Sequence, residues 1–180
     1  MVSEGMKMKT VWRLFKFHDP TNEISNAIKN GITIGEAIRT FGEKNFIGKE
    51  EWIGNVGLTA GIANLLDLAC ALAAPNAWSS TYAKLGVGDS ATATDPSQTG
   101  LQAGTNHVAV AMDSTYPKRS GTTVTFQSTF AAGVGTWHWQ EYVVTNNSEV
   151  TGTCLNRCLS DKGTKGSGDS WILQLQITVA

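Results

Sequence analysis

The feature that most constrains the fold of this chain is the alternation of apolar and polar residues in two segments of its second half, Thr122–Phe130 and Trp171–Val179. In each segment several apolar residues lie two or four positions apart and so share one face: Val124, Phe126, Phe130, Leu173, Leu175, Ile177 and Val179. Side chains along a β-strand point alternately to opposite faces of the sheet. The pattern therefore predicts two strands, each with one face on a core and one polar face.

Four further short segments resemble strands, and turn residues separate them: Tyr82–Val87, His107–Met112, Trp137–Val144 and Thr153–Leu159. A loop rich in Ser, Thr and Asp, residues 88–104, joins the first two. Six short strands within roughly 100 residues are typical of an antiparallel β-sandwich. We therefore predict a mainly β protein whose C-terminal domain is an antiparallel, jelly-roll-like β-sandwich.

The composition changes along the chain, and the first 52 residues hold 8 of its 14 Lys and Arg residues. Asp19-Pro20-Thr21 predicts the start of one short helix, which would end near Gly31. Thr33 and Glu36 have the spacing of a capping box, which predicts a second helix from Ile34 to about Phe41. We expect residues 1–54 to form a partly helical N-terminal arm and residues 55–180 to form a helix followed by the sandwich.

A third helix is expected from Asn55, as its cap, to the Pro75-Asn76 pair that would end it. Its apolar residues follow the spacing of one helix face: Leu58, Ile62, Leu65, Leu66, Ala69 and Leu72. We predict that this face packs on the sheet. Asp67 lies in the middle of the segment, and a charge there disfavours insertion into a membrane.

The charge balance and the cysteines exclude several classes of function. Fourteen basic and fifteen acidic residues leave a net charge of -1, which argues against nucleic acid as a partner. No segment in residues 1–17 resembles an export signal. The three cysteines are an odd number, so we expect free thiols in a reducing cytoplasm. Cys154 and Cys158 are interpreted as small core-facing thiols, because no neighbouring pair of ligands completes a metal site.

No catalytic motif is present, and we predict neither an enzyme nor a bound cofactor. The most unusual string is Trp137-His138-Trp139-Gln140-Glu141. If this string is a strand, then Trp137, Trp139 and Glu141 share one face and form an aromatic platform for a sugar ring. The alternative, which we favour, is that these aromatic residues belong to the core or to a subunit interface.

Several motifs between Asn55 and Ala180, about two-thirds of the chain, carry a resemblance to a known class of proteins. They are Asn55-Val56-Gly57-Leu58, Tyr82–Gly88, Gln98–Gln102, the strand Thr122–Phe130, Trp139–Tyr142, Leu155-Asn156-Arg157 and the closing strand Ser170–Val179. With these motifs the chain resembles the small β-sandwich structural proteins of tailed bacteriophage virions.

The resemblance implies a virion structural protein, assembled in the host cytoplasm, and favours a capsid decoration (cement) protein that stabilises the head shell. The alternative is a tail fibre or baseplate module that binds a host-surface glycan. The implied partners are the major capsid protein or other virion subunits, and a homo-oligomer is expected because the edge strands of a sandwich need covering. A trimer is one option. Neither nucleic acid nor a membrane is an expected partner.

The N-terminal arm carries more large apolar side chains than its short helices can bury. We therefore expect it to reach onto a neighbouring subunit, where such anchors supply most of the binding energy. The expected interface residues are Trp12, Arg13, Phe15, Phe17, Phe41, Phe46 and Trp52. In the alternative arrangement the arm folds back onto its own sandwich.

Overall fold

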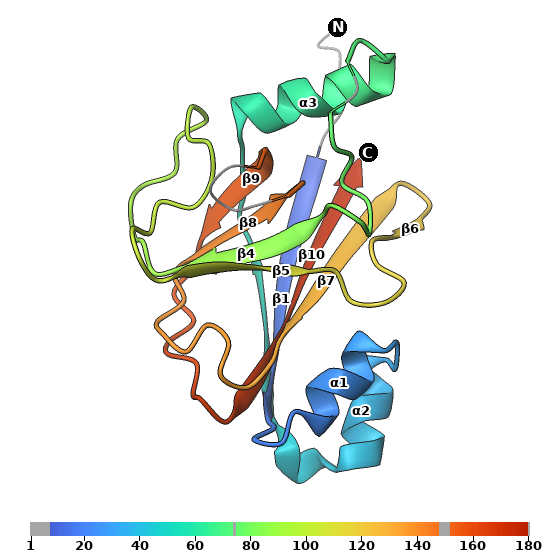
Figure 1. Cartoon of the computed structure of the whole chain (residues 1–180), viewed down its shortest axis with the longest axis vertical. Coiled ribbons are helices and arrows are strands. Elements are labelled where there is room, and N and C mark those ends of the chain that lie inside the picture. The colour runs from blue at the N-terminus through green and yellow to red at the C-terminus, as the bar shows by residue number, and fades with distance from the viewer. Residues whose placement is uncertain (1–7, 74, 148–151, 180) are drawn as a thin grey trace, which may run out of the picture.

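Two antiparallel sheets of five strands each form a β-sandwich in the computed structural model, which describes residues 8–73, 75–147 and 152–179 (Figure 1). The first sheet has the order β2 (Phe46–Ile53), β1 (Met8–His18), β10 (Asp169–Val179), β7 (Thr123–Phe130), β6 (Lys118–Ser120). The second has the order β3 (Val56–Gly57), β9 (Cys154–Leu159), β8 (Glu141–Thr145), β4 (Lys84–Gly88), β5 (His107–Ala111). The predicted sandwich is confirmed.

The core between the sheets contains the apolar residues that the alternating pattern selected on β7 and β10. Phe126, Phe130, Leu173, Leu175 and Ile177 are all buried there. They pack against residues of the second sheet that include Leu85, Val87, Tyr142, Val144 and Leu155. The alternation thus selects the core face of both strands, but the predicted polar outer face of β7 is not open: Gln127 and Thr129 are buried as well, where they bond to Asp113.

The N-terminal strand β1 corrects the predicted division of the chain at residue 54. β1 pairs with β10 along its whole length, from Met8 opposite Val179 to His18 opposite Asp169, and β2 pairs with its other side. Residues 8–53 thus belong to the sandwich and do not form a separate arm, whereas residues 1–7 of the predicted arm lie outside the described residues. This strand has bulky residues on both faces because both faces are covered.

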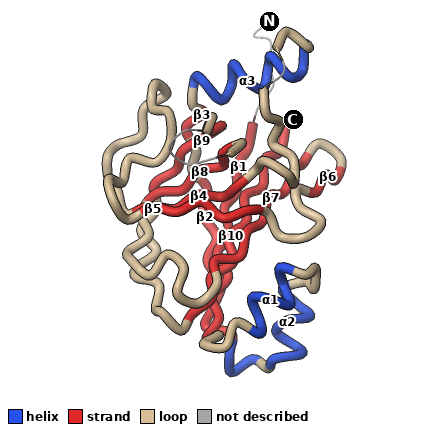
Figure 2. The backbone as a smooth tube through the Cα atoms, viewed as in Figure 1, coloured by secondary structure: helices blue, strands red, loops and turns tan. Residues whose placement is uncertain are grey.

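Two short helices, α1 (Glu23–Lys29) and α2 (Ile34–Phe41), and a 3-10 turn (Glu43–Asn45) pack on the outer face of the first sheet (Figure 2). The predicted capping box is present, with the Glu36 amide donating to Thr33 Oγ1 over 3.2 Å. Asp19 orders the start of α1, because its carboxylate accepts hydrogen bonds from the Ile24 and Ser25 amides. These contacts seat the helices over Phe17 and Ile172.

The third helix, α3 (Thr59–Cys70), lies across the other end of the sandwich (Figures 1 and 2) and differs from its prediction. Its N-cap is Leu58 rather than Asn55, and no side chain caps it. Within the helix only Gly61 and Asn64 are buried, whereas Ile62, Leu65 and Leu66 are exposed. The prediction that its apolar face packs on the sheet is wrong, because the contact is made by the helix side that contains Gly61.

Candidate functional site

The residues predicted to anchor a neighbouring subunit make contacts within this chain. Trp12 is fully buried in the core between the sheets, where its ring stacks on Trp52 with 6.2 Å between centroids. Phe17 is buried under the helices, with the partly buried Phe15, Phe41 and Phe46 packed in the same cluster. Arg13 pairs with Glu51 across neighbouring strands, at 2.6 Å. Residues 8–53 of the arm therefore pack on their own sandwich, as in the alternative arrangement.

The aromatic platform considered for Trp137, Trp139 and Glu141 is not present, because β8 begins only at Glu141. The favoured interpretation, a core position for the aromatic residues, holds for Trp139. The irregular backbone of residues 137–140 turns Trp139 into the core, where it has no exposed surface and contacts Phe130 and Trp171 edge-on. Trp137 is partly buried against the same core. Glu141 lies on the opposite, outer side of the sheet, so the three side chains do not share a face.

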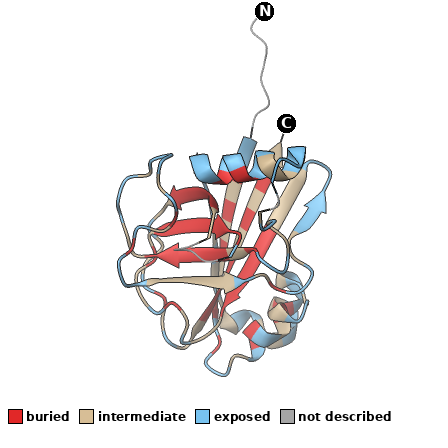
Figure 3. Cartoon of the chain, turned by 45° about the horizontal axis from the view of Figure 1, so that its top comes forward, coloured by how far each residue is buried: buried red, intermediate tan, exposed pale blue. Residues whose placement is uncertain are grey.

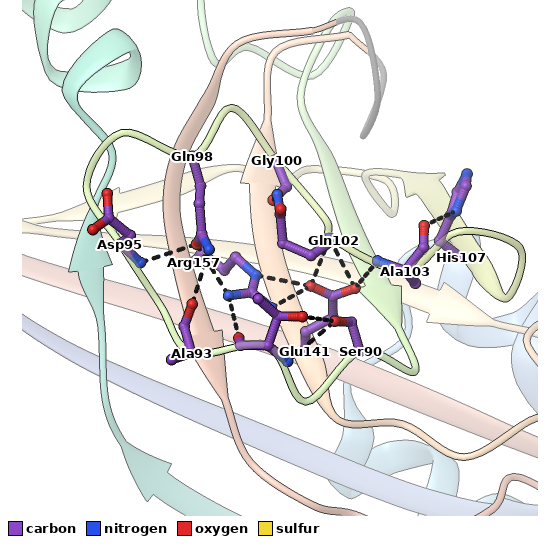
Figure 4. Close-up of polar contacts among 11 residues, drawn as sticks. Ser90, Ala93, Asp95, Gln98, Gly100, Gln102, Ala103, His107, Glu141 and Arg157 are labelled. Atoms are coloured by element: carbon purple, nitrogen blue, oxygen red, sulfur yellow. Dashed lines mark hydrogen bonds and ion pairs between the residues drawn. The ribbon is translucent and has the colours of Figure 1, made fainter.

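Glu141 forms a buried ion pair with Arg157 of the neighbouring strand β9 (Figure 4). Neither side chain has exposed surface, and Arg157 Nη2 and Nε lie 2.7 and 2.8 Å from Oε2 of Glu141. Both residues occur in segments predicted as strands, and a charged residue inside each of two core strands is the sequence signal that could have identified the pair. Sequence reasoning missed it.

The ion pair holds the long loop between β4 and β5 against the outer face of the second sheet. The amides of Gln102 and Ala103 donate to the Glu141 carboxylate at 2.8–3.1 Å, and Arg157 Nη1 donates to the Thr92 carbonyl and to Gln98 (Figure 4). Carboxylate and guanidinium thus have partners from both strands and loop. We call this set the loop clamp, and its groups are engaged in structural contacts.

Two other buried polar groups also have partners within the fold. Asp113 accepts hydrogen bonds from Gln127 and Thr129, while burial raises the pKa of its carboxyl above the ordinary value. Lys165 donates to the Ala131 carbonyl at 2.9 Å, and burial lowers its pKa to about 8. Both groups therefore stabilise local backbone geometry within the sandwich.

No disulfide joins any two of the cysteines among the described residues, and Cys154 and Cys158 are buried. A bulge in β9 places them in different clusters: Cys158 packs in the core between the sheets, and Cys154 packs under Leu58 on the outer face. Across the described part of the chain, no group of three or more His, Cys, Asp and Glu side chains has the arrangement of a metal site.

One surface with exposed large apolar side chains lies at the end of the sandwich, on α3 and the residues that follow it (Figure 3). Ile62, Leu66 and Leu72 are 45%, 55% and 75% exposed there. Beside the helix is a hollow of about 470 Å³ whose lining includes Leu65, Trp78, Phe126 and Ile177. Large apolar side chains that gather in the open mark a contact site for another molecule. We call Thr59, Ile62, Leu66 and Ala69 the α3 stripe.

Comparisons with known proteins identify no relative: no family model, no curated protein and no solved structure matches this chain. Among the helices of the three described ranges, none is both long enough and apolar enough to cross a membrane.

Proposed function

We propose that this chain is a structural subunit of a bacteriophage virion, and specifically a capsid decoration protein that stabilises the head shell through subunit contacts. The observation that carries the proposal is the exposed apolar surface of α3 beside the apolar hollow. A protein that functions inside an assembly buries such a surface against its neighbours. The resemblance of the sequence motifs to virion proteins is the reason to propose a phage head as this assembly.

The loop clamp supports the same proposal. Glu141 belongs to the string in which a sugar-binding face was considered, but Glu141 and its partner Arg157 are both fully buried and bonded to strand and loop. Their role is to hold a long loop as a rigid part of the surface. Rigid loops suit a subunit that makes fixed contacts, since little conformational entropy is lost on binding.

Binding to purified shells tests the proposal. The full chain is mixed with expanded shells of the major capsid protein encoded by the same genome, and bound copies are counted after gradient sedimentation. We expect on the order of hundreds of copies per shell for a decoration protein, because a symmetric shell repeats its sites many times. Absence of the chain from both shells and complete virions would overturn the proposal.

The copy number also separates the head from the tail. A tail fibre or baseplate subunit would be present at about a dozen copies in complete virions and absent from tailless shells. A tail module that binds a glycan was expected to use an aromatic platform, but Trp139 lies in the core and cannot contact a sugar. A tail position would therefore rest on protein contacts.

A further inference from the structure

Strand β2 forms an edge of the first sheet that no other strand of the described chain covers. It is the last strand on its side of the sheet, and it pairs with β1 alone among the described strands. Apart from this ladder, no backbone–backbone hydrogen bond within the described residues involves positions 47–53. The outward-facing N–H and C=O groups of an edge strand can pair with one further strand. The chemistry of this edge therefore selects an extended strand as its partner.

β2 is also the longest edge of the sandwich in the described part of the chain. The other edge strands there, β3, β5 and β6, have two, five and three residues, whereas β2 has eight. A short edge strand offers few backbone groups to a partner, and this limits unwanted pairing. Pairing at β2 therefore gains more hydrogen bonds than pairing at any of these three.

The exposed side chains of β2 are complementary to the same side chains of a second, reversed β2. Exposed and partly buried positions alternate along the strand, and the exposed row is Ile47, Lys49, Glu51 and Ile53. We consider an antiparallel pair whose two-fold axis passes Glu50. Each Ile47 then lies opposite Ile53 of the other copy, and each lysine of the row lies opposite a glutamate. Apolar side chains thus meet apolar ones, and each charge meets its opposite.

Neighbouring registers lack this match. With the axis at Lys49 or at Glu51, two like charges lie opposite each other at the centre, and an isoleucine faces a charge. With the axis at Gly48 or at Trp52, an isoleucine again faces a charged residue. Like charges directly opposite each other destabilise a pair of strands. The match is therefore specific to one register, and it identifies a second β2 as the partner rather than any apolar surface.

We propose that β2 pairs with β2 of a second copy of this chain, antiparallel about a two-fold axis at Glu50. The two five-stranded sheets then join into one continuous sheet across the axis. This pairing goes beyond the proposed function and does not depend on it, since it uses neither the α3 stripe nor the hollow beside it. It specifies a two-fold dimer as the homo-oligomer of this chain.

The partly buried row of β2 is compatible with the pairing. Gly48 lies opposite Trp52 of the second copy, and a Cβ at Gly48 would meet nothing within 4 Å, so the position leaves space for the indole. Glu50 lies opposite its own copy across the axis. Each Glu50 carboxylate already pairs with Lys16 and Lys162, at 2.5 and 3.1 Å. These two lysines offset the repulsion between the two carboxylates.

Two features of β2 protect it against unselective pairing. A bulge shifts its register with β1 next to Gly48, and Lys49 lies near the middle of the edge. Bulges and lysines both discourage a further strand from joining an edge. A lysine is accommodated there when an acidic residue lies opposite. Glu51 of the second copy supplies that residue, so these features leave the proposed pair as the favoured one.

The solution mass of the full chain, measured by sedimentation at concentrations up to about 0.5 mM, tests the pairing. The wild type should form dimers within this range. Lys49→Glu and Glu51→Lys each place like charges opposite each other at two positions, so each should weaken dimerisation about tenfold or more. Lys118→Glu is the matched control, because it makes the same change of charge on β6, the opposite edge of the same sheet, and it should dimerise as the wild type does. A wild type that stays monomeric throughout overturns the proposal.

A mixture of the two charge variants tests the register. Position 49 of one copy lies opposite position 51 of the other, so an equimolar mixture of Lys49→Glu and Glu51→Lys chains restores opposite charges at both positions. The mixture should therefore form heterodimers at concentrations where each variant alone is monomeric. Thermal unfolding of each variant shows that it is folded. A mixture of folded variants that stays monomeric overturns the register.

Engineered disulfides test the same register by distance. Lys49→Cys and Glu51→Cys are made separately in a Cys70→Ser background, where the remaining thiols are buried. Mild oxidation should crosslink a mixture of the two variants, because their positions lie directly opposite each other. Each variant alone should crosslink poorly, since identical positions are about 8 Å apart, beyond the reach of a disulfide. Efficient crosslinking of either variant with itself overturns the register.

The pairing and the proposed function fail separately. A dimer that never binds shells or virions overturns the virion function and leaves the pairing standing. A wild type that stays monomeric but binds shells, and loses that binding with both charge variants, assigns the β2 edge to the shell protein and overturns the pairing.

Discussion

Arg157 and Glu141 face each other across adjacent strands, with Nη2 and Oε2 2.7 Å apart and no exposed surface on either side chain. A buried charge that loses its partner costs about 3–5 kcal/mol. Glu141→Gln should therefore lower the free energy of unfolding by about that amount, measured by urea denaturation. Hydrogen exchange should also accelerate at Gln102 and Ala103, whose amides bond to the carboxylate. Equal losses for Glu141→Gln and for Glu51→Gln, in the more exposed pair with Arg13, would contradict the clamp.

Gly88 is the position where the loop clamp leaves no room for a side chain. A Cβ there would lie 2.4 Å from Oε1 of Glu141 and 3.0 Å from the Cβ of Ala103. Gly88→Ala should destabilise the fold by about 1–3 kcal/mol, because the carboxylate must move from its donors. Gly104→Ala is the control, since a Cβ there meets nothing within 4 Å. The two variants are compared by thermal unfolding, and similar melting temperatures would count against the tight contact.

The stability cost of replacing Trp139 tests whether this residue lies in the core or forms part of a surface platform. Its ring is fully buried and its Nε1 donates to the Gly135 carbonyl at 2.8 Å. Trp139→Ala should cost about 3–5 kcal/mol of stability, as for other large side chains removed from a core. Trp137→Ala should cost less, because Trp137 is only partly buried. Chemical denaturation of both variants measures this difference; a Trp139→Ala protein of wild-type stability would show that the residue is not in the core.

Lys165 should make stability depend on pH in the alkaline range. Burial lowers its pKa from 10.5 to about 8 in the folded chain. At a pH between these two pKa values, the unfolded chain binds more protons than the folded chain. The contribution of Lys165 to the free energy of unfolding therefore rises with pH in this range. This contribution to stability is lost as the pH falls through the folded-state pKa of about 8. Lys165→Met should remove this rise, measured by urea denaturation across the window, and the exposed Lys9→Met should keep it.

Regular segments of the chain were predictable because local rules decide them. The alternating apolar residues Phe126, Leu173 and Leu175 of β7 and β10 lie in the core as predicted. The Thr33–Glu36 spacing gives the capping box that starts α2. Both depend on the period of a strand or on contacts within one helical turn. These features need no knowledge of distant residues.

The predictions that were wrong concern segments where a contact with a distant residue overrides the local sequence pattern. Trp139 faces the core because the regular strand β8 begins only at Glu141, so the alternation of faces does not apply to residues 137–140. Nothing in the local sequence marks Glu141 as the start of the strand. The apolar face of α3 looked like a buried face, yet Gly61 makes the contact because only a glycine fits against β9. The pairing of β1 with β10 joins segments more than 150 residues apart, which a local pattern cannot reveal.

That pairing has a consequence for how the polypeptide matures. During synthesis β1 emerges early, but its neighbour β10 is made after the other described strands. The first sheet therefore cannot close on the ribosome until residues 169–179 have left the exit tunnel, and its long-range pairing is expected to be slow. Until then the apolar side chains of β1 are open to chaperones or to aggregation, so the yield of folded protein should depend on translation rate and on holdase capacity.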